Sequence, residues 1–507
     1  MKTSMPSSVR RRGVLVFLLA LSVYAATTGG SMATDIMSYE VTKGIVESGT
    51  VAMSHNVFQM DAHRGVDGRY YAPYGIGHAA YSIPFYVAAR AVERWDGLGV
   101  AKAEALRKAG FVMGSAVAAA LTVWVAFLFA WRLSSNERAA VQTALTLGFA
   151  TLLWPYAKFG FSAPLGALCV MCGTYGAWVG IRSNRRAMLV LGGAGFGCAL
   201  FVKHELVLLC LPVGLWMAAE SGWNVRRTVR RALFAGGPVV AAAIVTLYYN
   251  YTRFGNPLDT GYLRDSTVER GSFFVGLAGL LFSPGASFFL YSPALVAGVA
   301  ALATTLARRD RRTAALFVGE WLVLVCFYAT FAHWDGERSY GPRYLVPVIP
   351  ILVLPLAGWF ASEENRIRRR LLGGLVALSV LVQLPGILVD FSKVGYTPQV
   401  GHPAWAERQW TWKASALRLN GGAALSAVAD NVRYVVTAER PPLKAPQGEA
   451  RDFSEQFAFS LDFWWLYLFY LRAVSAPVAV LLGASCLVAA AFFASRLWRT
   501  TNRVSHS

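Results

Sequence analysis

The sequence predicts an all-α polytopic membrane protein of about twelve transmembrane helices, with a large first extracytoplasmic loop that carries interfacial helices. Composition is the first reason: 55% of the 507 residues are hydrophobic and only 15% are charged, whereas soluble domains carry roughly 25% charged residues. The second reason is that apolar runs of about 20 residues, the length that crosses a bilayer, recur along most of the chain.

Each predicted span is an apolar run bounded by polar residues. The spans cover about residues 13–30, 109–131, 139–156, 164–181, 187–203, 205–220, 232–250, 287–307, 313–331, 343–361, 371–389 and 474–496. The first one follows Arg10, Arg11 and Arg12 and looks like a signal peptide. It lacks a convincing small-x-small cleavage site before Asp35, so we expect an uncleaved signal-anchor helix.

Basic residues gather in one set of connections. These connections are short and cover residues 132–138, 182–186, 226–231, 308–312, 366–370 and the tail from 496. By the positive-inside rule they face the cytoplasm, together with both termini. The net charge of +20 is therefore spread over separate loops, and we expect no nucleic-acid partner.

The other connections are long, aromatic and mixed in charge, and all of them fall on the opposite face. They cover residues 34–108, 154–163, 203–205, 250–287, 332–341 and 390–472. A transporter usually places its ionisable groups near the bilayer midplane, whereas here they gather at one surface. This division predicts a transmembrane module over 1–389, an extracytoplasmic segment or small subdomain over 390–472, and a last span with a cytoplasmic tail over 473–507.

The first outer loop, about residues 31–108, is the most chemically varied stretch. Apolar positions between Asp35 and Val46 recur at helical spacing. The stretch from Tyr74 to Val92 is apolar and aromatic, and we expect it to lie in the outer interface. The six cysteines all fall within apolar runs, so the CxxC of Cys169 and Cys172 is interpreted as two small core residues rather than a redox or zinc site.

Six stretches between about residues 31 and 350 resemble, in order, the C-type glycosyltransferases, and most closely bacterial members of the protein O-mannosyltransferase-like branch (glycosyltransferase family 39). They are TDIMSYEVTKGIVESGT, DGRYYAPYGIGHAAYSIPFY, WPYAKFGFSAPLGAL, NYTRFGNPLDTGY, GLLFSPGASFFLYSPAL and HWDGERSYGPRYLVPVIP. The resemblance implies a C-type fold in the bacterial inner membrane. It also implies transfer of a sugar from a polyprenyl-phosphate donor to a hydroxyl of a glycan, lipid or protein acceptor at the extracytoplasmic face.

The resemblance places the catalytic base at Asp35, the acidic residue that opens the first outer loop. Such a base would take the proton of the acceptor hydroxyl as it attacks the anomeric carbon. The alternative role for Asp35 is the N-cap of the helix that follows it, and one side chain can fill both roles.

Cations on the same face are expected to hold the donor phosphate. We assign this role to Lys203, Arg338 and Arg343, with Arg64, Arg69 and Lys158 as further cations on that face. Mutual pairing of Lys203 with Glu205 is the competing interpretation. The side chains expected to contact substrate are Glu40, His204, Trp334, Asp335 and Tyr71.

The chain departs from the resemblance at Ala163, where relatives tend to carry a glutamate. Because a divalent ion prefers several oxygen ligands, Asp35 alone is a poor site. No cofactor is expected, although a divalent cation held with help from Glu40, Asp61 or Glu205 stays open. The pair His55 and His63 is interpreted as solvated loop histidines.

Two other functions compete with the transferase. One is a transporter or flippase of a lipid-linked glycan, which the absence of a visible internal repeat disfavours. The other is a catalytically inactive homologue, which the alanine at position 163 keeps open.

Overall fold

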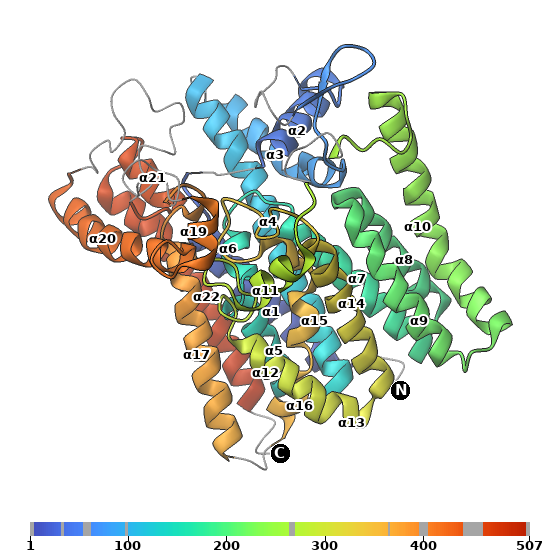
Figure 1. Ribbon diagram of the computed structural model, residues 1–507. Helices are drawn as coiled ribbons and strands as arrows, with labels where there is room; N and C mark the ends of the chain where they lie inside the picture. Colours follow the sequence, from blue (N-terminus) through green and yellow to red (C-terminus); the bar gives the residue numbers. More distant parts are fainter. Residues whose placement is uncertain are drawn as a thin grey trace.

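Long apolar helices run side by side and carry the loop-rich segments at one end of the bundle (Figure 1). This computed structural model describes residues 5–31, 35–53, 62–96, 100–262, 269–362, 366–394, 404–439 and 460–502. Nearly all regular structure in these ranges is helical, which confirms the all-α class.

In the first half of the chain, the described residues form eleven helical segments and one small hairpin. The helices are α1 (Ser7–Thr27), α2 (Ile36–Ser48), α3 (Gly77–Asp96), α4 (Val100–Ser134), α5 (Glu137–Phe149), α6 (Leu153–Ala157), α7 (Ala163–Arg182), α8 (Arg186–Val202), the 3-10 helix η1 (His204–Leu209), α9 (Cys210–Glu220) and α10 (Val225–Phe254). The strands β1 (His63–Arg64) and β2 (Tyr70–Tyr71) pair antiparallel, with His63 opposite Tyr71.

The second half is more broken. Its helices are α11 (Phe273–Phe282), α12 (Ala294–Ala301), the π-helix η4 (Leu302–Leu306), α13 (Ala307–Arg309), α14 (Arg311–Ala329), the 3-10 helix η5 (Arg343–Val348), α15 (Ile349–Val353), α16 (Leu356–Ala361), α17 (Arg366–Leu388), α18 (Phe391–Val394), α19 (Trp405–Trp410), α20 (Ala416–Thr437), α21 (Trp464–Tyr470) and α22 (Ala476–Asn502).

Seven helical stretches in the described ranges are long and apolar enough to cross a membrane. They are Ala103–Ser134, Ala163–Arg182, Val225–Phe254, Arg311–Ala329, Arg343–Ala361, Arg366–Leu388 and Ala476–Thr501. The other five predicted spans coincide with α1, which carries three arginines near its start, and with the shorter helices α5–α6, α8, η1–α9 and α12–α13. The structure supports a polytopic membrane protein, and the count of twelve stays a prediction.

Small residues allow the tightest helix packing in the bundle. A Cβ built on Gly176 of α7 would lie only 2.6 Å from the Cα of Gly192 on α8, so these two backbones touch at a distance that only glycine permits. Small residues at helix interfaces are typical of membrane proteins, where close backbone approach drives association.

The two ends of the bundle differ in content. Helices α2 and α3 and the helices α19–α21 lie at one end, whereas both termini lie at the other (Figure 1). The predicted extracytoplasmic segment is tied to the bundle, because α20 packs on α17. The indole N–H groups of Trp464 and Trp465 also donate to the Ala25 and Ala26 carbonyls at 2.8 and 3.0 Å.

Candidate functional site

Asp35 caps the helix α2, as the sequence predicted. Its carboxylate accepts the backbone N–H of Ser38 at 3.3 Å and the Ser38 hydroxyl at 2.8 Å, and the Asp35 side chain is only half-buried. The positive end of a helix dipole stabilises a carboxylate in this position. Asp35 is therefore a half-buried acid at the end of the bundle that carries the varied loops.

A buried ion pair holds Ser31, four residues before Asp35. Lys158 Nζ lies 2.9 Å from Asp462 Oδ2, and both side chains are completely buried. Asp462 accepts the backbone N–H of Ser31 at 2.7 Å and its hydroxyl at 3.2 Å. On the other side, Gly29 N–H donates to the Lys158 carbonyl at 3.0 Å and Asp35 N–H donates to the Gly160 carbonyl at 3.1 Å. We call this arrangement the Lys158–Asp462 clamp.

The sequence suggested Lys158 as a further cation on the outer face, but its side chain is completely buried in the clamp. Its ammonium also donates to the Ile387 and Val389 carbonyls at 2.7 and 2.9 Å. With these two carbonyls and Asp462 as partners, the Lys158 ammonium is enclosed by protein, so we no longer count Lys158 among the cations that could bind the donor phosphate.

Lys203 is the cation whose electrostatic environment includes Asp35. It follows α8 directly, and its ammonium lies 3.8 Å from Glu205 Oε1 and 4.5 Å from the centroid of the Tyr344 ring. The pKa of Lys203 is lowered, mainly by burial and also by the nearby Arg343. The carboxylates of Glu205 and Asp35 act in the opposite direction. The expected pair of Lys203 with Glu205 is present. The same ammonium also lies close enough to Asp35 and Arg343 to feel both charges.

Arg343 is the second cation of this cluster. Its guanidinium lies 5.5 Å from the Phe161 ring centroid and 5.2 Å from that of Tyr344. Among the described residues, no carboxylate oxygen lies within 4.0 Å of it. The turn at Gly336 (φ +86°) packs closely over this side chain, since a Cβ there would lie 2.9 Å from Arg343 Cγ. Arg343 therefore has donors to offer to an anion.

Aromatic rings wall this cluster. Tyr328 and Tyr344 stack with their centroids 4.5 Å apart and nearly parallel planes, and Tyr74 lies 5.6 Å from Tyr262. The Tyr328 hydroxyl donates to Glu205. We call the group formed by Asp35, Lys203, Glu205, Arg343 and these four tyrosines the Asp35–Arg343 cluster. The four tyrosines were not predicted as site residues, although Tyr74, Tyr262 and Tyr344 lie inside the motifs that carry the resemblance.

Two histidines lie beside the cluster. His204 packs edge-on against Tyr262 at 6.0 Å, and neither ring nitrogen has a hydrogen-bond partner among the described residues. Burial lowers its pKa. His78 is 2% exposed, and burial lowers its pKa to about 4 although Asp35 acts in the opposite direction. Both rings are therefore neutral at neutral pH.

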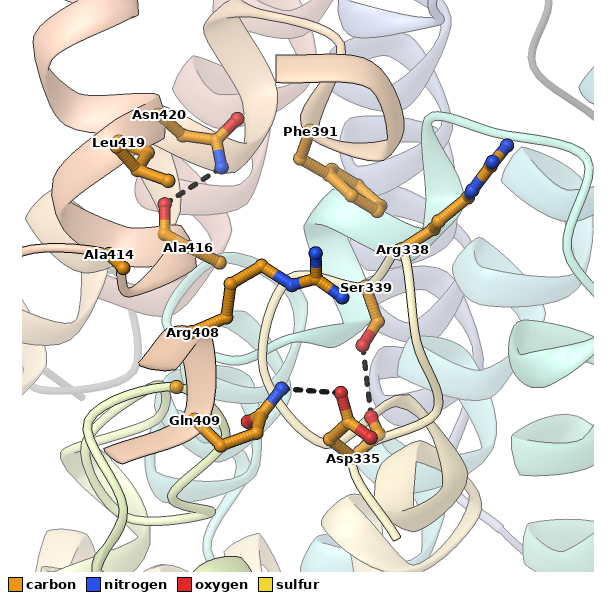
Figure 2. A pocket seen from close by; sticks show the side chains of 11 residues that line it. Asp335, Arg338, Ser339, Phe391, Arg408, Gln409, Ala414, Ala416, Leu419 and Asn420 are labelled. Atoms are coloured by element: carbon orange, nitrogen blue, oxygen red, sulfur yellow. Dashed lines mark hydrogen bonds between the residues drawn. The ribbon is translucent and has the colours of Figure 1, made fainter. Parts of the chain in front are cut away.

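The structure places Trp334, Asp335 and Arg338 in a neighbouring region. Trp334 is 1% exposed and packs edge-on against Trp405 at 5.9 Å, so its ring is enclosed by protein. Asp335 accepts the indole N–H of Trp405 at 3.1 Å and the amide of Gln409, and burial raises its pKa. Arg338 is exposed and lines the recess in Figure 2.

Two further predicted substrate contacts lie apart from the cluster. Tyr71 donates its hydroxyl to Asp67 at 2.8 Å, and burial together with this bond raises the pKa of Tyr71 to about 12. Glu40 is 8% exposed on α2 and acts electrostatically on the Tyr39 phenol. His55 and Asp61 lie outside the described residues.

The described residues do not suit a divalent cation at this site. No three His, Cys, Asp or Glu side chains within the described ranges lie close enough to share one ion. Ala163 opens α7 without a carboxylate, and the carboxylate of Glu205 is already engaged by Lys203 and Tyr328. A positive ammonium beside the available oxygens repels a cation. The chemistry below therefore relies on side chains alone.

Comparison with known proteins gave matches among solved structures. No family model and no curated protein sequence matches the chain. The chain is similar to ArnT from Cupriavidus metallidurans, both bound to undecaprenyl phosphate (16% identity, 91% of this chain and 84% of that one, TM-score 0.47) and in the apo state (16%, 90% and 84%, TM-score 0.49). It is also similar to the oligosaccharyltransferase AglB from Archaeoglobus fulgidus in complex with an inhibitory peptide and a dolichol-phosphate (12%, 92% and 63%, TM-score 0.48). All three identities are below 25% and all three TM-scores are below 0.5, and none of these structures is named as a protein O-mannosyltransferase.

Proposed function

We propose that this protein is a membrane glycosyltransferase that moves a sugar from a polyprenyl-phosphate donor to an acceptor hydroxyl at the extracytoplasmic face. The observation that carries the proposal is the meeting of Asp35 with Lys203 and Arg343 in one half-buried cluster. The transfer needs a base to accept the proton of the acceptor hydroxyl and positive charge to stabilise the leaving phosphate. Three distant parts of the chain supply this acid and these two cations. Polyprenyl phosphates are also bound in two of the structures that the chain resembles.

Asp35 is the proposed general base. In this role it accepts the proton of the acceptor hydroxyl while the oxygen bonds to the anomeric carbon and the bond to the phosphate oxygen breaks. Its half-buried position leaves it reachable, and the positive end of the α2 helix dipole lies beside it. Charge on the attacking oxygen develops only in the transition state, so a base placed here lowers the barrier rather than only binding substrate.

Lys203 and Arg343 are proposed to bind the phosphate and stabilise it as it leaves. A guanidinium can donate to two phosphate oxygens at once, and Arg343 has no carboxylate partner among the described residues. Lys203 lies 3.8 Å from Glu205, and in this role its ammonium turns from that carboxylate toward the bound phosphate. The electrostatic term is strong because both side chains lie in a partly desolvated place.

The tyrosine walls suit a sugar ring. Tyr74, Tyr262 and Tyr344 are all half-buried, so each presents part of an aromatic face to the cluster as well as a hydroxyl. An aromatic ring provides apolar contact for the C–H face of a sugar, and its hydroxyl donates to ring oxygens.

Purified protein incubated with a panel of labelled polyprenyl-phosphate sugars and simple hydroxyl acceptors tests the proposal. We expect consumption of at least one donor and release of polyprenyl phosphate, both absent from an Asp35→Asn preparation. Passage of intact donor across proteoliposomes without consumption would instead indicate a transporter.

The proposed face has its own test in a background without native cysteines. Ser426 is exposed on α20, in the segment predicted to be extracytoplasmic. Ser183 directly follows α7, in a connection predicted to be cytoplasmic. With cysteine at either position in intact cells, an impermeant maleimide should label position 426 and not 183. The reverse pattern would move the cluster to the cytoplasmic face.

A further inference from the structure

Helix α20 (Ala416–Thr437) touches the rest of the protein along one side. The side chains of this side are buried, and they are Asn420, Ala423, Ala424, Ala427, Asn431 and Tyr434. Ala423 and Ala427 share an apolar cluster with Val389, directly after α17, and Asn431 accepts the Tyr470 hydroxyl of α21. In Figure 1, α20 lies crosswise beside the end of α17 that is farther from the termini. It therefore runs across the direction of the spanning helices instead of along it.

The two exposed flanks of α20 differ in chemistry. One flank consists of aliphatic side chains, Leu425, Val428, Val432 and Val436, which are 78%, 41%, 61% and 79% exposed. The other flank consists of polar side chains, Ser426, Asp430, Arg433 and Thr437. Within each set the residues are three or four positions apart, so they line up on one side of the helix. We call these two sets the apolar flank and the polar flank.

The charges of α20 stay clear of the apolar flank. Asp430 and Arg433 belong to the polar flank, and Arg433 lies 3.9 Å from the exposed Glu439 that follows the helix. Arg418 lies at the N-terminal end of the apolar flank, but its guanidinium donates to the Lys413 carbonyl at 3.0 Å, before the helix begins. A long cationic side chain can keep its charged end in a polar place in this way. The apolar flank is therefore an uncharged strip of about three helical turns.

A strip of this kind marks an interaction surface. Single exposed apolar side chains are common on soluble proteins, whereas a contiguous set marks a protein interface or a membrane contact. A helix with an apolar flank and a separate polar flank matches the pattern of helices that lie in the plane of the membrane interface. The surroundings of α20 decide between lipid and a protein partner.

The helices that α20 touches expose apolar side chains of their own. Helix α20 packs on α17 and also contacts α22. Only 28% of the apolar stretch of α17 and 17% of that of α22 is buried inside the protein, against 83% for α7. Leu381, roughly two turns before the end of α17, is 61% exposed, and Leu481 near the start of α22 is 67% exposed. Acyl chains cover such faces in a membrane protein, so α20 borders a surface that lipid covers.

Two tryptophans mark the same level of the molecule. Trp410 ends α19, and Trp412 lies four residues before the start of α20. Their side chains are 42% and 53% exposed. Indole rings concentrate where acyl chains meet water, because the ring is apolar and its N–H is polar. An exposed pair of indoles at the entry to α20 indicates that this helix lies at that boundary.

We propose that α20 lies in the membrane interface, at the end of the bundle away from the termini, with its apolar flank in the acyl chains and its polar flank toward water. Helices of this type insert their apolar side about 5–10 Å into the boundary between head groups and acyl chains. The partner of the apolar flank is thus a lipid surface. The segment around α20 then belongs to the membrane-seated body of the protein, and not to a subdomain in the aqueous phase. The proposal does not depend on the transferase reaction.

Spin labels on single cysteines test the proposal in the full-length protein, purified in a background without native cysteines and placed at one copy per lipid nanodisc. The measured quantity is the ratio of collision rates with oxygen, which concentrates in acyl chains, and with a water-soluble nickel chelate. Val432→Cys reports on the apolar flank and Ser426→Cys on the polar flank. Leu381→Cys is the reference for acyl chains, and Val66→Cys, an exposed valine in the turn between β1 and β2, is the reference for water.

We expect the oxygen-to-nickel ratio at Val432→Cys to be several-fold above that at Ser426→Cys and close to that at Leu381→Cys. All four side chains are at least partly exposed, so the labelled variants should keep the melting temperature of their cysteine-free parent. A ratio at Val432→Cys equal to that at Val66→Cys would show that the apolar flank faces water, and it would overturn the proposal. Low collision rates with both reagents would show that protein covers this flank, which would overturn it as well. Because no donor is present, none of these results bears on the transferase.

Discussion

Lys158 and Asp462, from opposite halves of the chain, form a completely buried ion pair with 2.9 Å between Nζ and Oδ2. The carboxylate of this pair also holds Ser31, four residues before Asp35. The Asp462 carboxylate is thus both the partner of Lys158 in a buried ion pair and the acceptor that holds Ser31. Two variants can separate these roles.

The Lys158→Met/Asp462→Asn and Lys158→Met/Asp462→Leu double variants both remove the buried charges, which is often neutral for stability when both partners are replaced. Only asparagine keeps an oxygen for the Ser31 N–H. We expect similar melting temperatures, but a kcat roughly 10²-fold lower in the leucine variant with little change in the donor KM, because small misplacements of a reacting group are costly. Equal kcat values in the two variants would show that the anchor has no catalytic role.

The second prediction concerns Asp35 itself. Asp35→Asn keeps an oxygen that can cap α2 but removes the base. Loss of a general base lowers turnover by on the order of 10²–10⁴, and thermal unfolding should stay close to that of the wild type. Asp67→Asn, an exposed change in the same outer loop, is the control and should keep its activity. Near-normal donor turnover by Asp35→Asn would refute the assignment.

The third prediction concerns the phosphate. Arg343→Ala should weaken donor binding by about 2–5 kcal/mol, the usual effect of removing one partner of a buried charged hydrogen-bonded pair. Arg343→Lys should recover only part of this, because an ammonium lacks the two-pronged geometry of a guanidinium. The measurement is donor affinity by equilibrium binding. Arg64→Ala, at the exposed hairpin, serves as the control, and an unchanged affinity in Arg343→Ala would exclude Arg343 from the phosphate site.

The fourth prediction is that donor turnover survives an excess of a divalent-ion chelator. Lys203 and Arg343 provide the positive charge that a metal would otherwise supply, and the described carboxylates do not converge on one ion. Turnover is measured with and without chelator on the same preparation. Activity that disappears with chelator and returns with manganese or magnesium would contradict this mechanism and direct attention to Glu40, Asp61 and Glu205.

The fifth prediction concerns Asp390, which lies beside the clamp. Burial, followed by repulsion from Asp462, raises its pKa to about 6. A raised carboxyl pKa means that the folded protein disfavours the charged form of Asp390. The stability that the protonated carboxyl contributes is therefore present at low pH and is lost as the pH rises through about 6. Asp390→Asn should therefore gain stability relative to the wild type between pH 5 and 7. A difference in melting temperature that does not change with pH would contradict the assignment.

The fold class and part of the site followed from the sequence for clear physical reasons. Apolar length and the placement of arginines predict helices that cross a membrane. An acid before an apolar helical pattern predicts the N-cap at Asp35, which the structure confirms. The convergence of Lys203 and Arg343 with Asp35 is a tertiary fact that only the resemblance suggested.

Other expectations depended on packing that sequence patterns do not encode. Trp334 looked like a ring at a polar surface, but Gly279 lets that indole pack against α11, where it is enclosed. Lys158 looked like one more cation of the outer face, because nothing in the local sequence indicates a partner as distant as Asp462. The recess in Figure 2 was missed for the same reason, since only the folded chain brings α20 to the turn after α14.

The contact between Ser31 and Asp462 also sets an order of events during synthesis. A ribosome adds roughly 5–20 residues per second, so on the order of 20–90 s separate the translation of Asp35 from that of Asp462. Throughout that interval most of the bundle can insert while the segment before Asp35 lacks its anchor. If Asp35 is the base, a nascent chain in the membrane cannot use a donor properly until its last outer segment has been made. Translation of the segment that contains Asp462 would then act as the step that turns the enzyme on.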